Sequence, residues 1–323
     1  MLKIAMLVYD NCLQSGIAGI LDLMTLANWE YKRSNPEQKS PFCRLEIISL
    51  DGEPVTSFNR QPVAASAGIE DCEDSDLLIV PGMMGRPEML LEQKELTQWV
   101  GEQHKRGVVV ASACSGAFLL AAAGILKGRE ATTHWQLADR FRQRFPKVRL
   151  QIDRLLIDGG DYLTAGGTGA HIDLALYLIE KYASKSLADA CARMMLIDGI
   201  RRDQAPFVKF QGCRDHGDEP ILKVQQWIDR YYREKVSVRV MAKRAGLNER
   251  TFLRRFRKST GEAPLEYLQR VRVEKAKQLL LKTEQSLEEI TGNVGYVDLS
   301  SFRRLFRQIV GMSPTIYRQR FGA

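Results

Sequence analysis

An internal repeat in the last third of the chain constrains its fold more than any other feature. Gly246 and Gly295 are 49 residues apart, which places one extra residue between the glycine and the following helix in the second copy. A repeat this regular is not expected by chance and predicts two copies of one supersecondary unit. Five further pairs lie 50 residues apart, namely Phe252 and Phe302, Phe256 and Phe306, Gly261 and Gly311, Pro264 and Pro314, and Tyr267 and Tyr317.

Each copy consists of a short helix, a glycine turn and a basic helix, which is the pattern of a helix-turn-helix. In the second copy Phe302, Leu305 and Phe306 share one face, while the arginines fall on the opposite face. The segment Leu265–Lys282 lacks Gly and Pro and predicts one helix that connects the copies. Upstream, an apolar stripe predicts another helix, with Ile221, Val224, Ile228 and Tyr231 on one apolar face. A solvated surface helix would explain one basic helix alone, but it does not explain two copies.

The positive charge is confined to this third of the chain. Residues 1–220 hold 25 Lys and Arg against 29 Asp and Glu, whereas residues 221–323 hold 22 against 10. The net charge is therefore −4 in the first part and +12 in the second, for a total of +8. A basic excess located in this way indicates a polyanionic partner for the repeat. The alternative, a helical domain that binds only proteins, leaves the charge unexplained.

The outward faces of the two basic helices supply the candidate DNA contacts. Arginine can donate two hydrogen bonds to guanine, and leucine can contact a thymine methyl group. Two units on one chain would enter successive major-groove segments about one helical turn apart. The residues expected to reach base edges are Arg250, Leu253, Arg254, Leu299, Ser300, Arg303 and Arg304. Those expected to contact phosphate, which positions a protein without reading sequence, are Arg257, Lys258 and Arg307.

The first two thirds of the chain alternate short apolar runs with helical patterns. This alternation predicts a parallel sheet covered by helices on both faces, an α/β fold of the flavodoxin-like kind. Ligands of such sheets bind beyond the carboxyl ends of the strands. The expected strands are Lys3–Tyr9, Arg44–Leu50, Asp76–Val80, Gly107–Ser112 and Val148–Asp153. The expected helices are Ile17–Tyr31, Glu88–Lys105, Gly116–Ala123, Trp135–Phe145, Ala170–Tyr182 and Ser186–Ile200.

Ser112-x-Cys114-x-Gly116 lies where one of these strands runs into a helix, and it has the form of a nucleophile elbow. The positive end of the helix dipole favours a thiolate at such a position. The alternative is a small buried cysteine without a reactive role. The loop Pro81–Gly85 follows another strand at the same sheet edge, and its amides are candidates to bind an oxyanion together with the Ser115 amide. His134 follows Cys114 by twenty residues and is a candidate for the same site, whereas no role is expected for His104, His171 or His216.

The segments ACSGAFLLAAAGIL and GREATTHW make residues 3–200 resemble the class I glutamine-amidotransferase-like superfamily, in its ThiJ/PfpI group. The resemblance implies a pocket of Asp22, Met83, Cys114, Ser115 and His134, with the acid of the first helix hydrogen-bonded to the cysteine. Two positions depart from the group. Met83 replaces the second glycine of a Pro-Gly-Gly loop, and Ser115 replaces the histidine that follows the cysteine in peptidase members. The missing Cys-His pair counts against proteolysis.

The closing segment GYVDLSSFRRLFRQIVGMSPTIYR makes residues 220–321 resemble the AraC/XylS family of transcription regulators. We therefore expect a sensing domain at 1–200, a linker at 201–219 and a DNA-binding domain at 220–323. The expected protein is a cytoplasmic, dimeric regulator, an activator that responds to a small, nitrogen-containing metabolite. Its expected partners are double-stranded DNA, the effector and RNA polymerase, with no membrane and no cofactor. The six scattered cysteines predict neither a metal site nor a disulfide framework.

Two further functions compete with the simple regulator. The first domain of a regulator can also turn over its ligand, as an amide hydrolase or hydratase that uses Cys114. An enzyme with an accessory nucleic-acid-binding tail is the third alternative, and the complete two-copy DNA reader disfavours it. The fusion to a reader favours a sensor over an enzyme.

Overall fold

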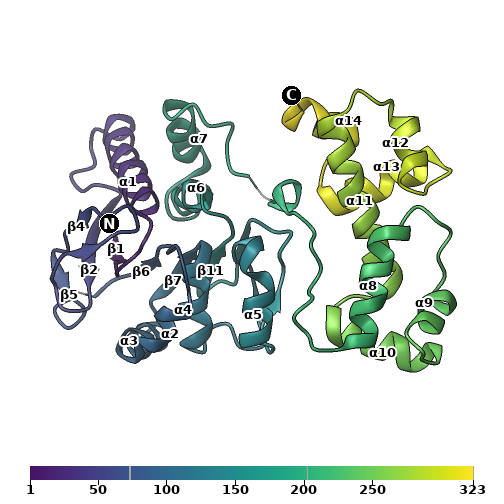
Figure 1. Ribbon diagram of the computed structural model, residues 1–323. Helices are drawn as coiled ribbons and strands as arrows, with labels where there is room; N and C mark the ends of the chain where they lie inside the picture. The colour runs from purple at the N-terminus through teal and green to yellow at the C-terminus, as the bar shows by residue number, and fades with distance from the viewer. Residues whose placement is uncertain (73, 202, 323) are drawn as a thin grey trace. The chain divides into compact units, whose positions relative to one another are not determined.

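The computed structural model describes residues 1–72, 74–201 and 203–322. The chain divides into two compact units, Met1–Gln204 and Ala205–Ala323. The first unit contains a sheet with helices and the second is built of helices (Figure 1). No helix in the described residues is long and apolar enough to cross a membrane.

The first unit is organised around a seven-stranded sheet with the order β10-β11-β7-β6-β1-β2-β5. All neighbouring strands are parallel except β10, which pairs antiparallel with β11 at one edge. The five long central strands follow the order 2-1-3-4-5 of doubly wound flavodoxin-like sheets. They are β1 (Leu2–Leu7), β2 (Cys43–Ser49), β6 (Leu77–Val80), β7 (Val109–Ala113) and β11 (Tyr162–Ala165), with β5 (Ala67–Gly68) and β10 (Leu156–Asp158) at the edges.

Helices cover both faces of this sheet, which explains why β6 and β11 are buried along their whole length. On one face α1 (Gln14–Ser34), α6 (Ala170–Tyr182) and α7 (Lys185–Met194) pack against one another. The other face carries α2 (Met89–Glu92), α3 (Lys94–Lys105) and α4 (Ala117–Ala122). The remaining elements are β3 (Val55–Thr56), β4 (Pro62–Val63), β8 (Glu130–Ala131), β9 (Arg149–Leu150), α5 (Ala138–Arg144) and the 3₁₀ turns η1 (Cys114–Gly116) and η2 (Trp135–Leu137).

The predicted α/β class is confirmed, and four of the five expected strands lie in the main sheet. The fifth, Val148–Asp153, forms only the two-residue strand β9, which pairs with β8 and does not join the main sheet. The place next to β7 belongs to β11, a four-residue strand that the periodicity did not reveal. The expected helix Glu88–Lys105 is divided in two at Gln93, whose φ of −83° and ψ of 76° are not helical.

The second unit contains seven α-helices in its described residues, and it has two small cores. One core gathers Ile221, Trp227, Phe252 and Phe256, and the other gathers Phe302, Phe306 and further apolar side chains. Of the predicted apolar face of α8, Ile221, Val224 and Ile228 are buried, whereas Tyr231 is 42% exposed; Trp227 is buried as well. The helices are α8 (Glu219–Tyr231), α9 (Val238–Arg244), α10 (Glu249–Thr260), α11 (Pro264–Lys282), α12 (Leu287–Asn293), α13 (Leu299–Val310) and α14 (Pro314–Phe321), preceded by the 3₁₀ turn η3 (Ala205–Phe207).

The connecting helix expected at Leu265–Lys282 is confirmed as α11, which contributes to both cores. Its first half places Tyr267 and Val271 in the first core, and its second half places Val273 and Leu280 in the second. The two helix-turn-helix copies, α9–α10 and α12–α13, are therefore joined by one shared helix. This shared helix positions the two basic helices α10 and α13 within one unit.

Candidate functional site

The candidate ligand site lies at the point where the strand order of the sheet reverses. The neighbouring strands β1 and β6 connect in opposite directions. The connection after β1 leads to β2 on one side, and the connection after β6 leads to β7 on the other, so the two loops diverge. Crevices at such a switch point bind ligands in doubly wound sheets. Here the two loops are joined, since Leu13 N donates to Gly82 O at 2.8 Å and Met84 N donates to Asn11 O at 3.2 Å.

Cys114 follows β7 at the same end of the sheet and has the strained backbone of a nucleophile elbow. Its φ is +54°, in the left-handed region that non-glycine residues rarely adopt. Two glycines make the close packing of this turn feasible. A Cβ on Gly82 would lie 2.8 Å from the Cys114 Cβ, and one on Gly116 would lie 2.6 Å from the Val80 carbonyl oxygen. The sequence pattern therefore identified a real elbow.

The expected thiolate is wrong, because Cys114 is only 4% exposed. Burial raises the pKa of the Cys114 thiol to about 11, although hydrogen bonds from Ser115 and Thr168 act in the opposite direction. The effect of desolvation on the pKa of the thiol thus outweighs the opposite effect of the amides at the start of the helix. This raised pKa favours the protonated thiol at neutral pH.

Two amides of the Pro81–Gly85 loop, those of Met83 and Met84, already have acceptors within the fold, which argues against the oxyanion site expected there. Met83 N donates to the Ser115 hydroxyl oxygen at 2.7 Å, and this hydroxyl donates to Met83 O at 2.9 Å. The Ser115 amide hydrogen-bonds the Cys114 sulfur. The serine that replaces histidine after Cys114 therefore fastens the elbow to the neighbouring loop.

Among the described residues no hydrogen bond joins Asp22 or His134 to Cys114, contrary to what the resemblance implies. Asp22 is exposed, because α1 buries the opposite face through Ile20, Leu23 and Met24. The His134 ring stacks on Trp135 with ring centroids 5.6 Å apart, and its Nδ1 accepts a hydrogen bond from Gln136 N at 3.2 Å. Burial lowers the pKa of His134, which favours the neutral ring. His134 caps η2 in this arrangement.

Three residues that the sequence did not single out surround the elbow instead. Thr168 hydrogen-bonds the Cys114 sulfur through its side chain, and the Thr133 hydroxyl donates to Cys114 O at 2.8 Å. His171 Nδ1 donates to Thr168 O at 3.0 Å, and its ring occupies the space that a side chain on Gly19 of α1 would fill. Burial lowers the pKa of His171, so its Nε2 is an acceptor. The Gly-Gly-Thr turn after β11 is the signal that would have located Thr168.

The site therefore offers neutral hydrogen-bonding groups rather than fixed charges. The Cys114 thiol and the Thr168 hydroxyl can each donate or accept, and a neutral His171 offers one acceptor. Across the residues that the structure describes, no group of three or more His, Cys, Asp or Glu side chains is placed to hold a metal ion.

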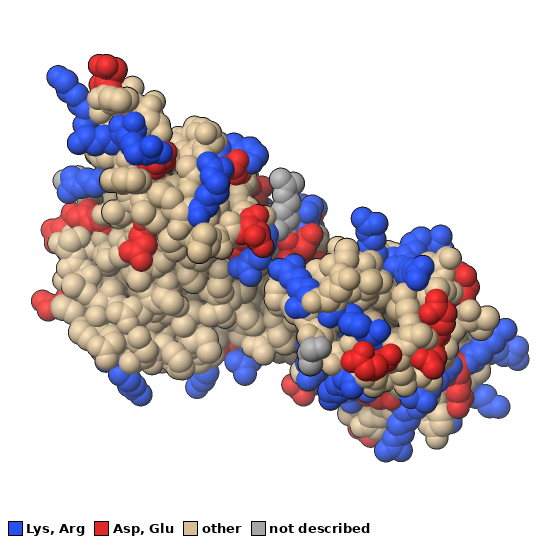
Figure 2. Space-filling view, turned by 90° about the horizontal axis from the view of Figure 1, so that it is seen from above, with Lys and Arg blue, Asp and Glu red and all other residues tan. Residues whose placement is uncertain are grey.

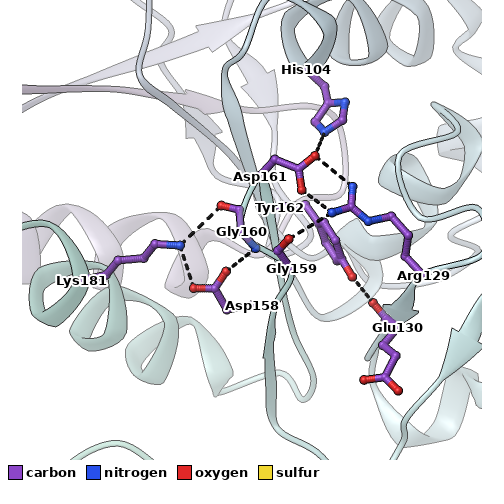
Figure 3. Close-up of polar contacts among 9 residues, drawn as sticks. All are labelled: His104, Arg129, Glu130, Asp158, Gly159, Gly160, Asp161, Tyr162 and Lys181. Atoms are coloured by element: carbon purple, nitrogen blue, oxygen red, sulfur yellow. Dashed lines mark hydrogen bonds and ion pairs between the residues drawn. The ribbon is translucent and has the colours of Figure 1, made fainter.

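A charged cluster at the opposite end of the sheet fixes the β10–β11 hairpin (Figure 3). Asp161 accepts hydrogen bonds from Arg129 at 2.9 Å and His104 at 2.9 Å, and the Arg129 guanidinium lies 4.1 Å from the centre of the Tyr162 ring. The hydrogen bond from Arg129 is the main cause that holds the pKa of Asp161 well below its usual range. Lys181 reaches the same turn through Asp158 at 2.7 Å. These contacts explain how so short a strand as β11 is held beside β7.

The candidate nucleic-acid interface consists of the outward faces of α10 and α13. In the described part of the chain no hydrogen bond or ion pair engages the guanidiniums of these faces, whereas inward-facing Arg255 is held by Asp218 at 2.7 and 2.9 Å. Figure 2 shows Lys and Arg side chains spread over the second unit. Leu299 is half-buried, and the other nine predicted contacts are exposed, namely Arg250, Leu253, Arg254, Arg257, Lys258, Ser300, Arg303, Arg304 and Arg307.

Both basic helices begin and end in the same way. The Asn248 side chain accepts from Thr251 N at 2.9 Å at the start of α10, and Asp298 accepts from Ser301 N at 2.7 Å at the start of α13. Gly261 and Gly311 end the two helices with φ of 80° and 79°, which suits glycine. The matching caps give the two helices one geometry.

An elbow-bearing doubly wound domain followed by two joined helix-turn-helix copies defines the class of protein. Residues 27–181 match the DJ-1/PfpI family, and residues 241–320 match a helix-turn-helix domain family. The chain belongs to the AraC-type regulators that carry a DJ-1/PfpI domain.

Individual relatives cover both parts of the chain. The HTH-type transcriptional regulator CdhR of Pseudomonas aeruginosa is 29% identical over 274 residues, which covers 84% of this chain and 80% of the relative. The isonitrile hydratase of Pseudomonas putida is 31% identical over 142 residues, covering 44% of this chain and 60% of the enzyme. An AraC family transcriptional regulator structure from Pseudomonas putida shares the fold, with a TM-score of 0.52 at 20% identity, over 60% of this chain and all of that one.

Proposed function

We propose that this protein is a sequence-specific DNA-binding transcription regulator. The observation that carries the proposal is the pair of matched helices α10 and α13, each with a row of exposed, unengaged arginines on a rigid, capped scaffold. Each helix is anchored by buried phenylalanines on its inner face. The guanidinium groups on its outer face are therefore free to contact base edges and phosphates. A relative that covers most of the chain is named a transcriptional regulator, which supports the proposal.

The N-terminal unit serves as the sensor of a small metabolite in this proposal. Its site at the switch point combines a neutral thiol, a threonine hydroxyl and a neutral imidazole, groups that bind and orient a polar molecule. The resemblance to amidotransferase-like regulators implies a nitrogen-containing effector. A dimer formed through this unit, activation of transcription and contact with RNA polymerase belong to the same proposal.

The test is selection of DNA by the full chain from a random-sequence duplex library, followed by titration of the enriched duplex. We expect one enriched motif with two elements about one helical turn apart. Arg304→Ala is expected to relax the preference at one position and to weaken binding by about tenfold, because a bidentate base contact discriminates by about 1–3 kcal/mol. Arg307→Ala is the matched control, with a uniform loss for all sequences. Enrichment of no motif contradicts the proposed function.

A second candidate, cysteine-dependent turnover of the ligand, is favoured by the strained elbow at Cys114. The protonated thiol and the engaged Met83 and Ser115 amides support binding over covalent chemistry. We expect the native chain to react with iodoacetamide at Cys114 far more slowly than a free cysteine at pH 8, since burial raises its pKa to about 11. Peptide mass spectrometry measures the labelling. Rapid labelling at pH 8, lost in Cys114→Ala, would favour the enzyme.

A further inference from the structure

The segment 205–218 was expected to belong to a linker, yet it is fastened to the second unit along its length. We call it the brace. Phe207 packs edge-on against Phe321 of α14 with ring centroids 5.4 Å apart. Lys277 of α11, which is only 6% exposed, donates to Val208 O at 2.5 Å. Phe210 packs against the Tyr267 ring at 5.1 Å. A flexible spacer does not make such contacts.

The C-terminal end of the brace is also hydrogen-bonded to helices of the second unit. Gln225 of α8 is fully buried and donates through its side-chain amide to Cys213 O at 2.8 Å. Asp218 ends the segment, caps α8 by accepting from Ile221 N at 3.3 Å, and pairs with Arg255 of α10 through both carboxylate oxygens. A bidentate pair of this kind fixes orientation as well as distance.

The brace thus contacts both basic helices. Its first turn, η3, packs against α13, where Ala205 is the nearest neighbour to the space beside Gly311. Its last residue, Asp218, holds α10 through Arg255. The connecting helix α11 also contacts both basic helices, and it contributes to both cores. A shift of the brace therefore acts on both helices at once.

The residue before the brace is anchored beside the candidate ligand site. Gln204 is 2% exposed, and its amide nitrogen donates to Thr133 O at 2.9 Å, Thr132 Oγ1 at 3.1 Å and Arg154 O at 3.2 Å. Thr133 in turn donates its hydroxyl to Cys114 O. One residue thus separates Gln204 from the elbow, and one peptide bond joins it to the brace.

We propose that residues 205–218 are a positioning element that sets the relative orientation of α10 and α13, with Gln204 as its anchor on the ligand-site wall. A molecule bound near Cys114 that shifts Thr133 alters this anchor, and the backbone carries the change to both DNA-reading helices. This inference rests on the proposed function. It locates the two-state element that a regulator requires, since a ligand acts only through unequal affinity for two arrangements.

The first experiment uses the duplex enriched by the full chain, together with duplexes in which the spacing of the two elements is changed by one base pair. Arg255→Leu installs the residue found at the matching position of the second copy, Leu305. We expect it to lower affinity for the original spacing by about tenfold and to level the affinities for the three spacings. The matched control is Lys223→Leu, which removes an exposed pair with Glu219 at 3.6 Å and should leave binding unchanged.

Each outcome decides one point. Enrichment of no duplex means that the proposed function fails. Enrichment with Arg255→Leu behaving like Lys223→Leu, or losing affinity equally for every spacing, overturns the brace and leaves the regulator intact.

The second experiment tests the anchor by hydrogen exchange of the full chain without DNA. Gln204→Met removes the three donated hydrogen bonds, and we expect faster exchange in 205–218 and in α13. Gln98→Met, an exposed glutamine on α3, is the control. Unchanged exchange in the brace overturns the role of Gln204. Should Gln204→Met fail to fold, Lys277→Met releases Val208 from within the second unit and must level the spacing preference as Arg255→Leu does.

Discussion

The two helix-turn-helix copies have nearly the same core and very different surroundings. Phe252 and Phe256 lie 5.4 Å apart between ring centroids, and Phe302 and Phe306 lie 5.8 Å apart. In each copy the second phenylalanine meets a tyrosine edge-on, at 5.5 Å for Tyr267 and 5.7 Å for Tyr317. The residues that repeat at 50-residue spacing thus form the same aromatic interior in both copies.

Outside the interior the copies differ in what holds the basic helix. Position 255 is an arginine bound to Asp218, whereas the matching Leu305 packs against the second core. The turn glycines differ as well. The space beside Gly246 is open, but a Cβ on Gly295 would lie 2.6 Å from the carbonyl oxygen of Arg233, just after α8. The basic helix of the first copy is held to the brace by an ion pair, whereas that of the second is held by apolar packing in its own core.

The largest loss of stability is expected when a buried phenylalanine of either copy is removed. Phe256→Ala and Phe306→Ala each empty a fully buried site, and each should cost about 3–5 kcal/mol of unfolding free energy. Because the two cores are joined by α11, we expect each change to accelerate hydrogen exchange in both copies. Chemical denaturation and exchange of the full chain measure the two quantities.

The pair of variants also tests whether the copies are one folding unit. Exchange that accelerates only in the mutated copy would show that α11 does not couple them, and would weaken the comparison. Phe207→Ala, on the half-exposed ring of the brace, is the control and should cost clearly less.

A smaller effect is expected at the turn glycines, where the copies diverge. Alanine is strained at both, because φ is +65° at Gly246 and +84° at Gly295. Only Gly295→Ala also forces a contact with the Arg233 carbonyl, so it should cost about 1–3 kcal/mol more than Gly246→Ala. Thermal unfolding of the two variants measures the difference. Equal losses would mean that the backbone at Arg233 moves away from the second turn without a measurable cost in stability.

The sequence predicts the repeated interior of the two copies better than the contacts that surround it, and the same holds for the rest of the chain. The strands, the elbow at Cys114 and the two DNA-reading helices were predictable, because periodicity, turn chemistry and a repeat are local patterns. β11 was not, since its four residues carry no alternation and their position depends on Arg129 and Asp161 holding the hairpin.

The sequence predicts where the candidate ligand site lies, but it does not predict which groups line the site or whether they are charged. Only the resemblance places Asp22 in the site, whereas the rotation of α1 that exposes it is set by packing against α6 and α7. In the sequence Ser115 differs from the family only as a missing histidine, although its hydroxyl engages both polar backbone atoms of Met83. Burial decides the charge of Cys114, and burial is a property of the assembled fold. The brace escaped prediction for the same reason, because a segment without periodicity can still be fixed by its neighbours.

The smallest effect is expected at the helix caps, where Asn248 of the first copy matches Asp298 of the second at the 50-residue period. Hydrogen bonds from Ser301 lower the pKa of Asp298, so its folded-state value lies below the unfolded one. The contribution of this cap is complete above the unfolded pKa and is lost as the pH falls through the folded value. Asn248 does not titrate. Amide exchange at Ser301, corrected for intrinsic rates, should therefore rise relative to Thr251 as the pH falls below about 4.

Asp298→Asn gives the second copy the cap of the first and should abolish this pH dependence while leaving the exchange at Thr251 unchanged. Arg304, whose charge also lowers the pKa of Asp298, remains in place in this variant. If Ser301 still loses protection in acid, the dependence arises elsewhere in the second copy. The cap would then not distinguish the two copies, and the main difference between their basic helices would remain the ion pair that Asp218 forms with Arg255 of the first, where the second has Leu305.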